Sequence, residues 1–156
     1  MQHGGQVELD ARHGADRGEG GFGGERGPDR SAEAPTRAAD HVLEKKTLPQ
    51  QALLYRLSGD KNPLHADPGF AKLGGFDRPI LHGLCSFGMA CKAAVDAACE
   101  GKVERVARYR ARFAGVMFPG ETLVTSVWKE DGKLVIAASA KERSAAVLSN
   151  AVIELK

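Results

Sequence analysis

The chain has 156 residues, 42% of them hydrophobic, and a formal net charge of +2. This length provides for one ordinary domain with a hydrophobic core, and so small a charge excludes nucleic acid and anionic membranes as expected partners. Residues 1–40 hold five basic and eight acidic residues, whereas residues 41–156 hold seventeen and twelve. The larger part is mildly basic, which suits an anionic small ligand.

The first 40 residues contain nine of the nineteen glycines and, after Met1, only three larger apolar residues, Val7, Leu9 and Phe22. They cannot bury enough surface to offset the entropy lost on ordering. We therefore expect a disordered or linker segment over 1–40 and a folded domain over 41–156. No apolar run is long enough for a transmembrane helix, and no terminal targeting signal is visible.

The start of the expected domain predicts one strand and two short helices. Residues 41–47 favour a strand, and residues 48–57 favour a helix that Gly59 ends. A second helix begins after Asp67, because an aspartate followed by proline is a common start of a helix. Gly74 stops it.

The longest predicted helix spans 81–100 and is apolar on nearly all sides, so we expect other structure to wrap around it. All three cysteines of the chain, Cys85, Cys91 and Cys99, lie in this segment. Three is an odd number, and their spacing does not match a zinc site. We expect buried free thiols, which fit a reducing compartment.

The remainder of the chain favours antiparallel strands over 103–113, 122–129, 133–141 and 145–155, with a hairpin turn at Asp131 and Gly132. A long apolar helix, one strand before it and about four strands after it indicate the α+β class. The expected architecture is an antiparallel β-sheet curled around a long central helix.

Alternation over 103–113 places Arg108, Arg110 and Arg112 on one face of the strand and Tyr109 and Phe113 on the other. A solvated face explains such arginines, and contact with the phosphates of a ligand is the alternative. Recognition of RNA or DNA is not favoured, because the aromatic side chains lie on the opposite face.

A candidate catalytic cluster lies just after the first predicted helix. Asp60, Asn62 and His65 fall within six residues, and Pro63 stiffens the turn between them. Aspartate and histidine commonly transfer protons to and from a reacting atom, and asparagine can orient a water or a side chain. The structural alternative is that Asp60 and Asn62 are ordinary turn residues and that His65 caps the next helix.

Gly83 lies near the first turn of the central helix, where backbone N–H groups lack partners and the helix dipole is positive. Glycine lets a ligand approach the backbone closely, so the N–H of Gly83 is a candidate donor to an oxyanion. Tight packing is the alternative explanation for this glycine. The neighbouring His82 favours a structural role.

At these residues the chain resembles the MaoC-like or hydratase 2 family, and most closely the second hydratase half of the peroxisomal multifunctional enzymes. The matching stretch is Tyr55-Arg-Leu-Ser-Gly-Asp-Lys-Asn-Pro-Leu-His-Ala-Asp-Pro-Gly-Phe-Ala71. The segment that follows, Gly75 to Gly88, resembles the family's oxyanion segment. Later strands resemble the family at Phe118-Pro-Gly-Glu-Thr-Leu123, so the resemblance covers roughly residues 41–156.

The resemblance implies a hot dog fold and the reversible hydration of trans-2-enoyl-CoA to (3R)-3-hydroxyacyl-CoA, a hydro-lyase reaction of fatty acid metabolism. Asp60 and His65 would be the acid/base pair, with either one as the base, and Asn62 would support them. The N–H of Gly83 would polarise the thioester carbonyl. Residues expected at the substrate are Pro79, Ile80, Leu81, His82, Gly83 and Arg112. No metal or redox cofactor is implied, because the thioester itself acidifies the α-carbon.

Eukaryotic relatives of this type carry two hot dogs in one chain, and this chain resembles only the second. The resemblance therefore implies a homodimer or pairing with a separate hot dog half. A peroxisomal location is implied for a eukaryotic source and a cytoplasmic location otherwise. Two alternatives stay open: a non-catalytic acyl-CoA-binding hot dog, and a dehydratase that acts on acyl carrier protein thioesters.

Overall fold

A computed structural model describes residues 6–7 and 32–156 of the chain. Its sheet has the strand order β1-β3-β6-β5-β4-β2. All neighbouring strands are antiparallel except the short β1, which runs parallel to β3. The strands are β1 (Gln6–Val7), β2 (His41–Lys46), β3 (Val106–Phe113), β4 (Thr122–Glu130), β5 (Lys133–Ala140) and β6 (Ala145–Leu155). The five longer strands confirm the predicted antiparallel sheet.

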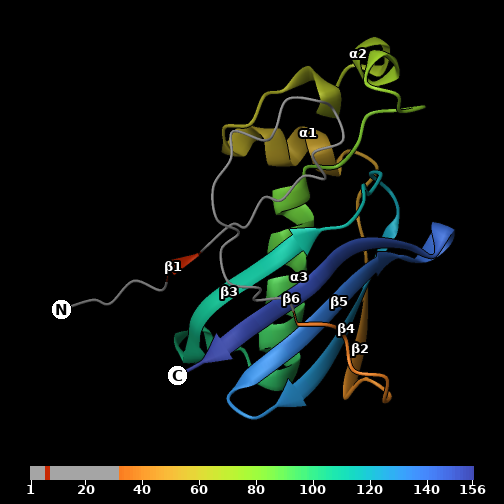
Figure 1. Cartoon of the computed structure of the whole chain (residues 1–156). Helices are drawn as coiled ribbons and strands as arrows, with labels where there is room; N and C mark the ends of the chain where they lie inside the picture. The colour runs from red at the N-terminus through yellow and green to blue at the C-terminus, as the bar shows by residue number, and fades with distance from the viewer. Residues whose placement is uncertain (1–5, 8–31) are drawn as a thin grey trace, which may run out of the picture.

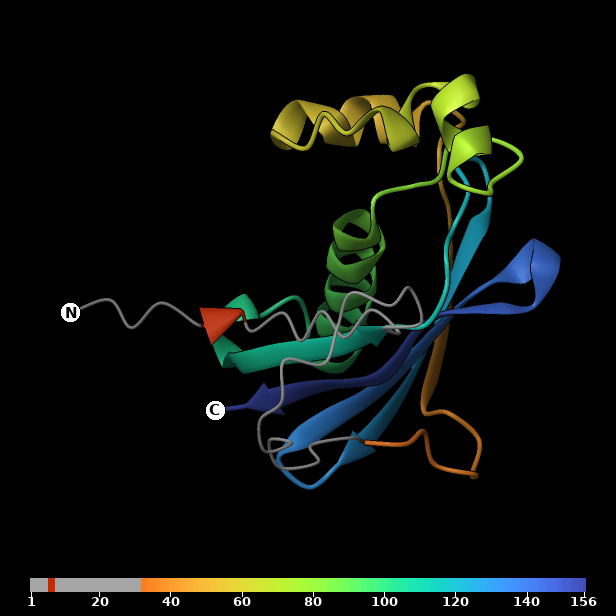
Figure 2. The ribbon, with the colours of Figure 1, turned by 45° about the horizontal axis from the view of Figure 1, so that its top comes forward.

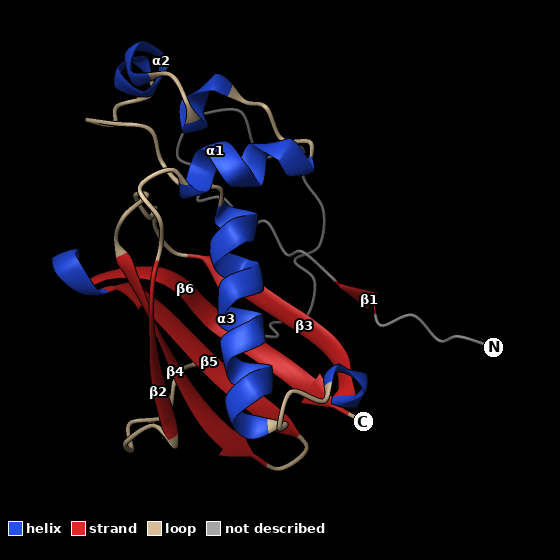
Figure 3. Ribbon diagram, turned by 180° about the vertical axis from the view of Figure 1, so that it is seen from behind, coloured by secondary structure: helices blue, strands red, loops and turns tan. Residues whose placement is uncertain are grey.

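The central helix α3 (Gly83–Ala98) lies along the concave side of this sheet, as Figures 1 and 3 show. Ala90 and Ala94 are fully buried, because small side chains let the helix approach the strands closely. The helix ends where Gly101, at φ 74°, donates its N–H to the carbonyl of Val95 over 3.1 Å. The predicted α+β fold with a central helix is confirmed.

The sheet packs on one side of α3, and most residues of the helix are buried or half-buried. Leu84, Lys92 and Asp96 lie on one exposed stripe. A single curled sheet can enclose one side of a helix, so the other side stays open in the lone chain. The three cysteines are free thiols, as predicted, and Cys85 and Cys99 are buried.

Short helical segments lie beyond the N-terminal end of α3, and α1 (Gln51–Tyr55) runs across it (Figures 1 and 2). The others are α2 (Pro68–Leu73) and, between α1 and α2, the 3₁₀ turns η1 (Arg56–Ser58) and η2 (Pro63–His65). The expected helix over 48–57 is therefore split, and Gly59 ends it at φ 121°. Asp67 caps α2 as predicted, accepting hydrogen bonds from the N–H groups of Gly69 and Phe70.

The strand expected over 103–113 begins later, because residues Val103–Arg105 form a 3₁₀ turn, η3. Within β3 the predicted alternation holds, since Tyr109 and Ala111 are buried. The hairpin at Asp131–Gly132 is also confirmed: Glu130 pairs with Lys133, and Gly132 has φ 68°. In residues 32–156, no helix has the length and hydropathy needed to cross a membrane.

The expectation of disorder over 1–40 falls mostly outside the described residues. Within that stretch, β1 pairs with Arg108 and Tyr109 of β3. Arg37 forms ion pairs with Asp40 and Glu130, and its carbonyl accepts a hydrogen bond from the indole of Trp128 at 2.9 Å. Both Gln6–Val7 and Arg37 therefore contact the sheet from before the expected domain boundary at residue 41.

The loop before β4 is held by a buried carboxylate. Glu121 is 4% exposed and accepts hydrogen bonds from Arg143 at 2.6 and 3.1 Å and from the N–H of Phe118 at 2.8 Å. Burial opposes ionisation of this carboxyl, but the bonds from Arg143 and Phe118 outweigh it, so the pKa of Glu121 lies below its ordinary value of 4.5. The carboxylate therefore stabilises the fold above about pH 4.5, and this contribution is lost as the pH falls through its lowered pKa.

We expect Glu121→Gln to lower the free energy of unfolding by about 2 to 4 kcal/mol at pH 7, because Arg143 loses its buried partner. The difference from wild type should shrink on acidification. Urea unfolding at pH 7 and at pH 3.5 measures both effects. Glu44→Gln is the matched control, because Glu44 pairs with Lys141 on the exposed surface, where a pair contributes about 0.5 kcal/mol or less. Equal effects of the two changes would contradict the structural role of Glu121.

Candidate active site

The loop between η1 and η2 is shaped by two side chains that fold back on their own backbone. The Oδ1 atom of Asp60 accepts a hydrogen bond from the N–H of Asn62 at 3.1 Å. Oδ1 of Asn62 accepts one from the N–H of Leu64 at 3.0 Å and so caps η2, which begins at Pro63. Asp60 and Asn62 therefore both form turns, as the alternative explanation of these residues predicted. The turn also leaves Oδ2 of Asp60 directed toward His65.

His65 is anchored on one side and open on the other. It is 8% exposed, and its Nδ1 lies 2.8 Å from the carbonyl oxygen of Ile80. A carbonyl only accepts, so Nδ1 carries the hydrogen and Nε2 is left for chemistry. Nε2 lies 4.0 Å from Oδ2 of Asp60. That separation is too long for a direct hydrogen bond and suits a water molecule held between the two groups.

His82 packs against both Asp60 and His65. It is 2% exposed, its ring stacks on that of His65 with centroids 3.6 Å apart, and its Nε2 lies 3.0 Å from the backbone oxygen of Asp60. Burial, with a smaller effect from His65, lowers the pKa of His82 despite the bond to Asp60. Tyr55 contacts the same ring at a centroid distance of 4.9 Å. His82 therefore contacts both proposed catalytic residues.

Asp60, His65 and His82 each offer one potential metal ligand atom within 4.8 Å of the others. The geometry does not favour a metal centre, because the planes of the two rings are only 25° apart and stacked rings direct their nitrogens side by side instead of toward one point. One nitrogen of each ring also lies against a backbone carbonyl. The expectation that no metal is required stays a prediction.

Gly83 is the first residue of α3 and is exposed. Its N–H stands at the first helical position, where the helix itself provides no acceptor and the dipole favours negative charge. A Cβ at this residue would lie 2.9 Å from Cε1 of Phe113. The close approach of Phe113 therefore supports tight packing as one reason for this glycine, and the role of its N–H as an oxyanion donor stays a prediction.

The other residues predicted at the substrate divide into two groups. Ile80 and Leu81 are buried, and their backbone groups act as anchors: the carbonyl of Ile80 accepts from His65, and the N–H of Leu81 donates to Met117 at 2.7 Å. Pro79, half-buried, precedes them. Arg112 is exposed on β3, and within residues 32–156 no hydrogen bond or ion pair joins it to the Asp60–His65 loop. Its contact with substrate stays a prediction.

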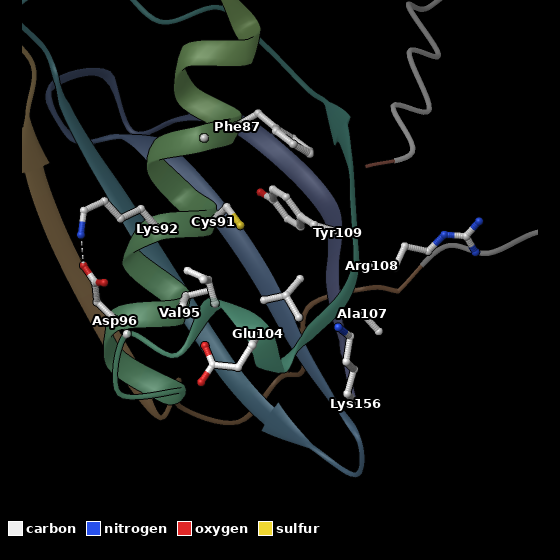
Figure 4. Close-up of a pocket in the computed structure, with 14 residues that line it drawn as sticks. Phe87, Cys91, Lys92, Val95, Asp96, Glu104, Ala107, Arg108, Tyr109 and Lys156 are labelled. Atoms are coloured by element: carbon white, nitrogen blue, oxygen red, sulfur yellow. Dashed lines mark hydrogen bonds and ion pairs between the residues drawn. The ribbon is translucent and has the colours of Figure 1, made fainter. Parts of the chain in front are cut away.

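A pocket of about 830 Å³ between α3 and β3 was missed by sequence reasoning. Figure 4 shows Tyr109 of β3 facing Phe87 and Cys91 of α3. The rings of Phe87 and Tyr109 stack with centroids 4.0 Å apart, and Phe87 lies 6.4 Å from Phe113, the neighbour of Gly83. The sequence did contain a signal for this pocket, because small residues of the central helix and the alternating face of β3 that carries Tyr109 could have been matched as its two walls. Apolar lining is provided by Phe87, Cys91, Val95, Val103, Val106 and Tyr109.

The family follows from comparison with known proteins. The sequence model described as MaoC like domain matches residues 30–151. The chain belongs to this MaoC-like family. The predicted loop, the anchored histidine and the glycine at the helix start therefore lie in a MaoC-like domain.

Individual relatives agree with this assignment. The chain is 58% identical over 136 residues to the enoyl-CoA hydratase ChsH3 of Mycobacterium tuberculosis, covering 87% of this chain and 48% of that protein. It is 51% identical over 118 residues to the peroxisomal enoyl-CoA hydratase 2 of Arabidopsis thaliana, covering 76% and 38%. The crystal structure of a MaoC-like dehydratase from Phytophthora capsici superposes with a TM-score of 0.83 at 44% identity, covering 90% of this chain and 50% of that one. The chain thus spans about half the length of these relatives or less.

Proposed function

We propose that this MaoC-like chain hydrates trans-2-enoyl-CoA to (3R)-3-hydroxyacyl-CoA. The observation that carries the proposal is the 4.0 Å gap between Oδ2 of Asp60 and Nε2 of His65. Gly83 begins α3 directly after His82, whose ring stacks on that of His65. A water held by an acid/base pair beside a carbonyl-polarising donor is what addition to an enoyl thioester needs. The similarity to enoyl-CoA hydratases supports this substrate class.

In the proposed reaction Asp60 and His65 share one proton. The water gives a proton to one member while its oxygen bonds to C3 of the enoyl group, and the π electrons shift to C2. The other member delivers its proton to C2, so the pair again holds one proton after each turnover. The N–H of Gly83 donates to the thioester oxygen, where negative charge develops. Either member can start as the acid, because the proton belongs to the coupled pair.

The test is a hydration assay with purified protein. We expect the absorbance of the conjugated thioester to fall with crotonyl-CoA or longer enoyl-CoA, and chiral analysis to give the (3R) product. An (3S) product or no turnover at any chain length would contradict the proposal. Carrier-protein thioesters in the same assay test the dehydratase alternative. Calorimetric binding of acyl-CoA without turnover would indicate the non-catalytic alternative.

The pocket between α3 and β3 is the proposed site of the acyl chain. Its apolar lining suits a hydrocarbon, and Phe87 and Phe113 link it to the start of α3 at Gly83. We expect Cys91→Trp to fill part of the pocket and to lower kcat/KM for decenoyl-CoA by about 10- to 100-fold, equivalent to about 1.4 to 2.7 kcal/mol of lost binding. Activity with crotonyl-CoA should change little.

Cys91→Ser is the matched control, because it keeps the volume of the side chain. It should leave the preference between the two chain lengths unchanged. A parallel loss with both substrates in Cys91→Trp, in a protein of wild-type circular dichroism, would show that the pocket does not hold the chain.

The partner we propose is a second hot dog, either another copy of this chain or a separate half. β3 is paired along its length with β6, and among the described residues its other side pairs with only the two residues of β1. The open side of α3 carries Leu84 at 42% exposure, and α1 carries Leu53 at 49%. An unprotected strand edge next to exposed apolar side chains favours association. Sedimentation should show a dimer, and a strict monomer at micromolar concentration would contradict homodimer formation.

The proposed location depends on the source of the protein. One plant relative is named as peroxisomal, which supports a peroxisomal location if the source is eukaryotic. A cytoplasmic location is proposed otherwise, and a fluorescent fusion in the source cell tests either case.

A further inference from the structure

His82 is packed against the proposed catalytic pair without belonging to it. It precedes α3, and its carbonyl accepts the N–H of Cys85 at 3.0 Å, which ties the residue to the first turn of the helix. Its ring lies on the ring of His65, with centroids 3.6 Å apart, and contacts Tyr55 on α1. At 2% exposure, the side chain is fixed from several elements at once.

The protonation of His82 follows from its contacts. Nε2 lies 3.0 Å from the backbone oxygen of Asp60, and a carbonyl oxygen only accepts, so Nε2 carries the hydrogen. Nδ1 is buried and has no hydrogen-bond partner among the described residues. A second proton there would bury both a charge and an unpaired N–H, which is unfavourable. Burial accordingly lowers the pKa of His82, and the ring is neutral with its hydrogen on Nε2.

The two stacked rings therefore hold opposite tautomers. His65 donates from Nδ1 to Ile80 and presents Nε2 to the side chain of Asp60. His82 donates from Nε2 to the backbone of the same Asp60. Asp60 is largely exposed, with 55% of its side chain accessible, so its own loop gives it little packing. The bond from His82 and the turn through Asn62 are what hold it opposite His65.

We propose that His82 is a positioning residue that sets the gap between Asp60 and His65 and, as a neutral ring, keeps a second positive charge away from His65. This inference rests on the proposed hydratase function. The titratable and charged groups around the stacked rings are Asp60 from the loop, Arg56 from η1, Tyr55 from α1 and Cys85 from α3. Of these, Asp60 favours the charged form of an adjacent imidazole and Arg56 opposes it.

The decisive variant is His82→Phe, which keeps a stacking ring and removes the N–H to Asp60. We expect kcat to fall by about 10- to 100-fold, with KM changed less than about threefold, because displacement of a reacting group acts mainly on the chemical step. The pH profile of kcat/KM should also change, because it depends on the spacing of the acid/base pair, whereas a purely structural loss would leave its shape unaltered. His82→Gln can still donate to the carbonyl of Asp60 and should recover part of both effects.

NMR titration of the His65 ring supplies a readout that does not depend on turnover. Its midpoint should differ from wild type in His82→Phe and return toward wild type in His82→Gln. The control is His41→Phe. His41 lies on β2, and like His82 it has one buried ring nitrogen without a hydrogen-bond partner among the described residues, here Nε2. This variant should leave kcat and the His65 titration unchanged.

If His82→Phe does not fold, as judged by circular dichroism, His82→Asn replaces it. The asparagine side chain is too short to reach the backbone oxygen of Asp60. Either folded variant with wild-type kcat and an unmoved His65 titration would overturn the proposal. A wild-type chain that hydrates no enoyl thioester but shows the shifted His65 titration in the variant would refute the proposed function while upholding the positioning role.

Discussion

Asp60→Asn is expected to lower kcat for enoyl-CoA hydration by about 10²- to 10⁴-fold, the usual contribution of one acid/base group. Asparagine can still accept the N–H of Asn62 through its side-chain oxygen, so the turn that Asp60 forms at 3.1 Å should persist. It cannot accept or deliver a proton. The loss should therefore appear in kcat while the thermal midpoint of unfolding stays near wild type, as measured by circular dichroism.

The partner variant His65→Ala should be similarly inactive, and the double variant should be scarcely worse than either single one. Residues that act as one unit show this non-additivity, because removal of either member ends the proton exchange. Additive losses would indicate that Asp60 and His65 act independently. Asp67→Asn is the matched control: it removes a carboxylate seven positions along the chain, and asparagine caps a helix as well as aspartate does.

Gly83→Ala is the second change with a large expected effect. Its Cβ would lie 2.9 Å from the ring of Phe113, so either the start of α3 or that ring must shift. Overpacking of this kind destabilises a protein by about 1 to 3 kcal/mol. Displacement of the proposed oxyanion donor should lower kcat by about 10- to 100-fold. Urea unfolding and the hydration assay measure the two effects separately.

Gly88→Ala controls for the change from glycine to alanine in the same helix. Nothing lies within 4 Å of a Cβ at Gly88, so this variant should gain up to about 1 kcal/mol of stability from helix propensity. Adding Phe113→Leu to Gly83→Ala should restore part of the lost activity by making room. If Gly83→Ala alone behaves like Gly88→Ala, the close approach to Phe113 has no role in the site.

Local signals in the sequence predicted most of the secondary structure. Asp67 before Pro68, Gly101 after α3 and Asp131–Gly132 between β4 and β5 each act within a few residues, so their effect is visible without the fold. The expectations that needed adjustment are less local. The helix expected over 48–57 became α1 and η1, and α3 keeps one exposed stripe.

The sequence by itself determined the α+β class, the capping and turn residues, and the grouping of Asp60, Asn62 and His65 on one short loop, because spacing along a short loop depends on local geometry. Only the tertiary structure decided the 4.0 Å gap between Asp60 and His65, the stack of His82 on His65, and the pocket between α3 and β3. The gap depends on bonds that anchor His65 to Ile80, 15 positions away, and Asp60 to His82, 22 positions away. The stack and the pocket likewise join separate elements, and such contacts arise from packing, which no pattern along the chain specifies.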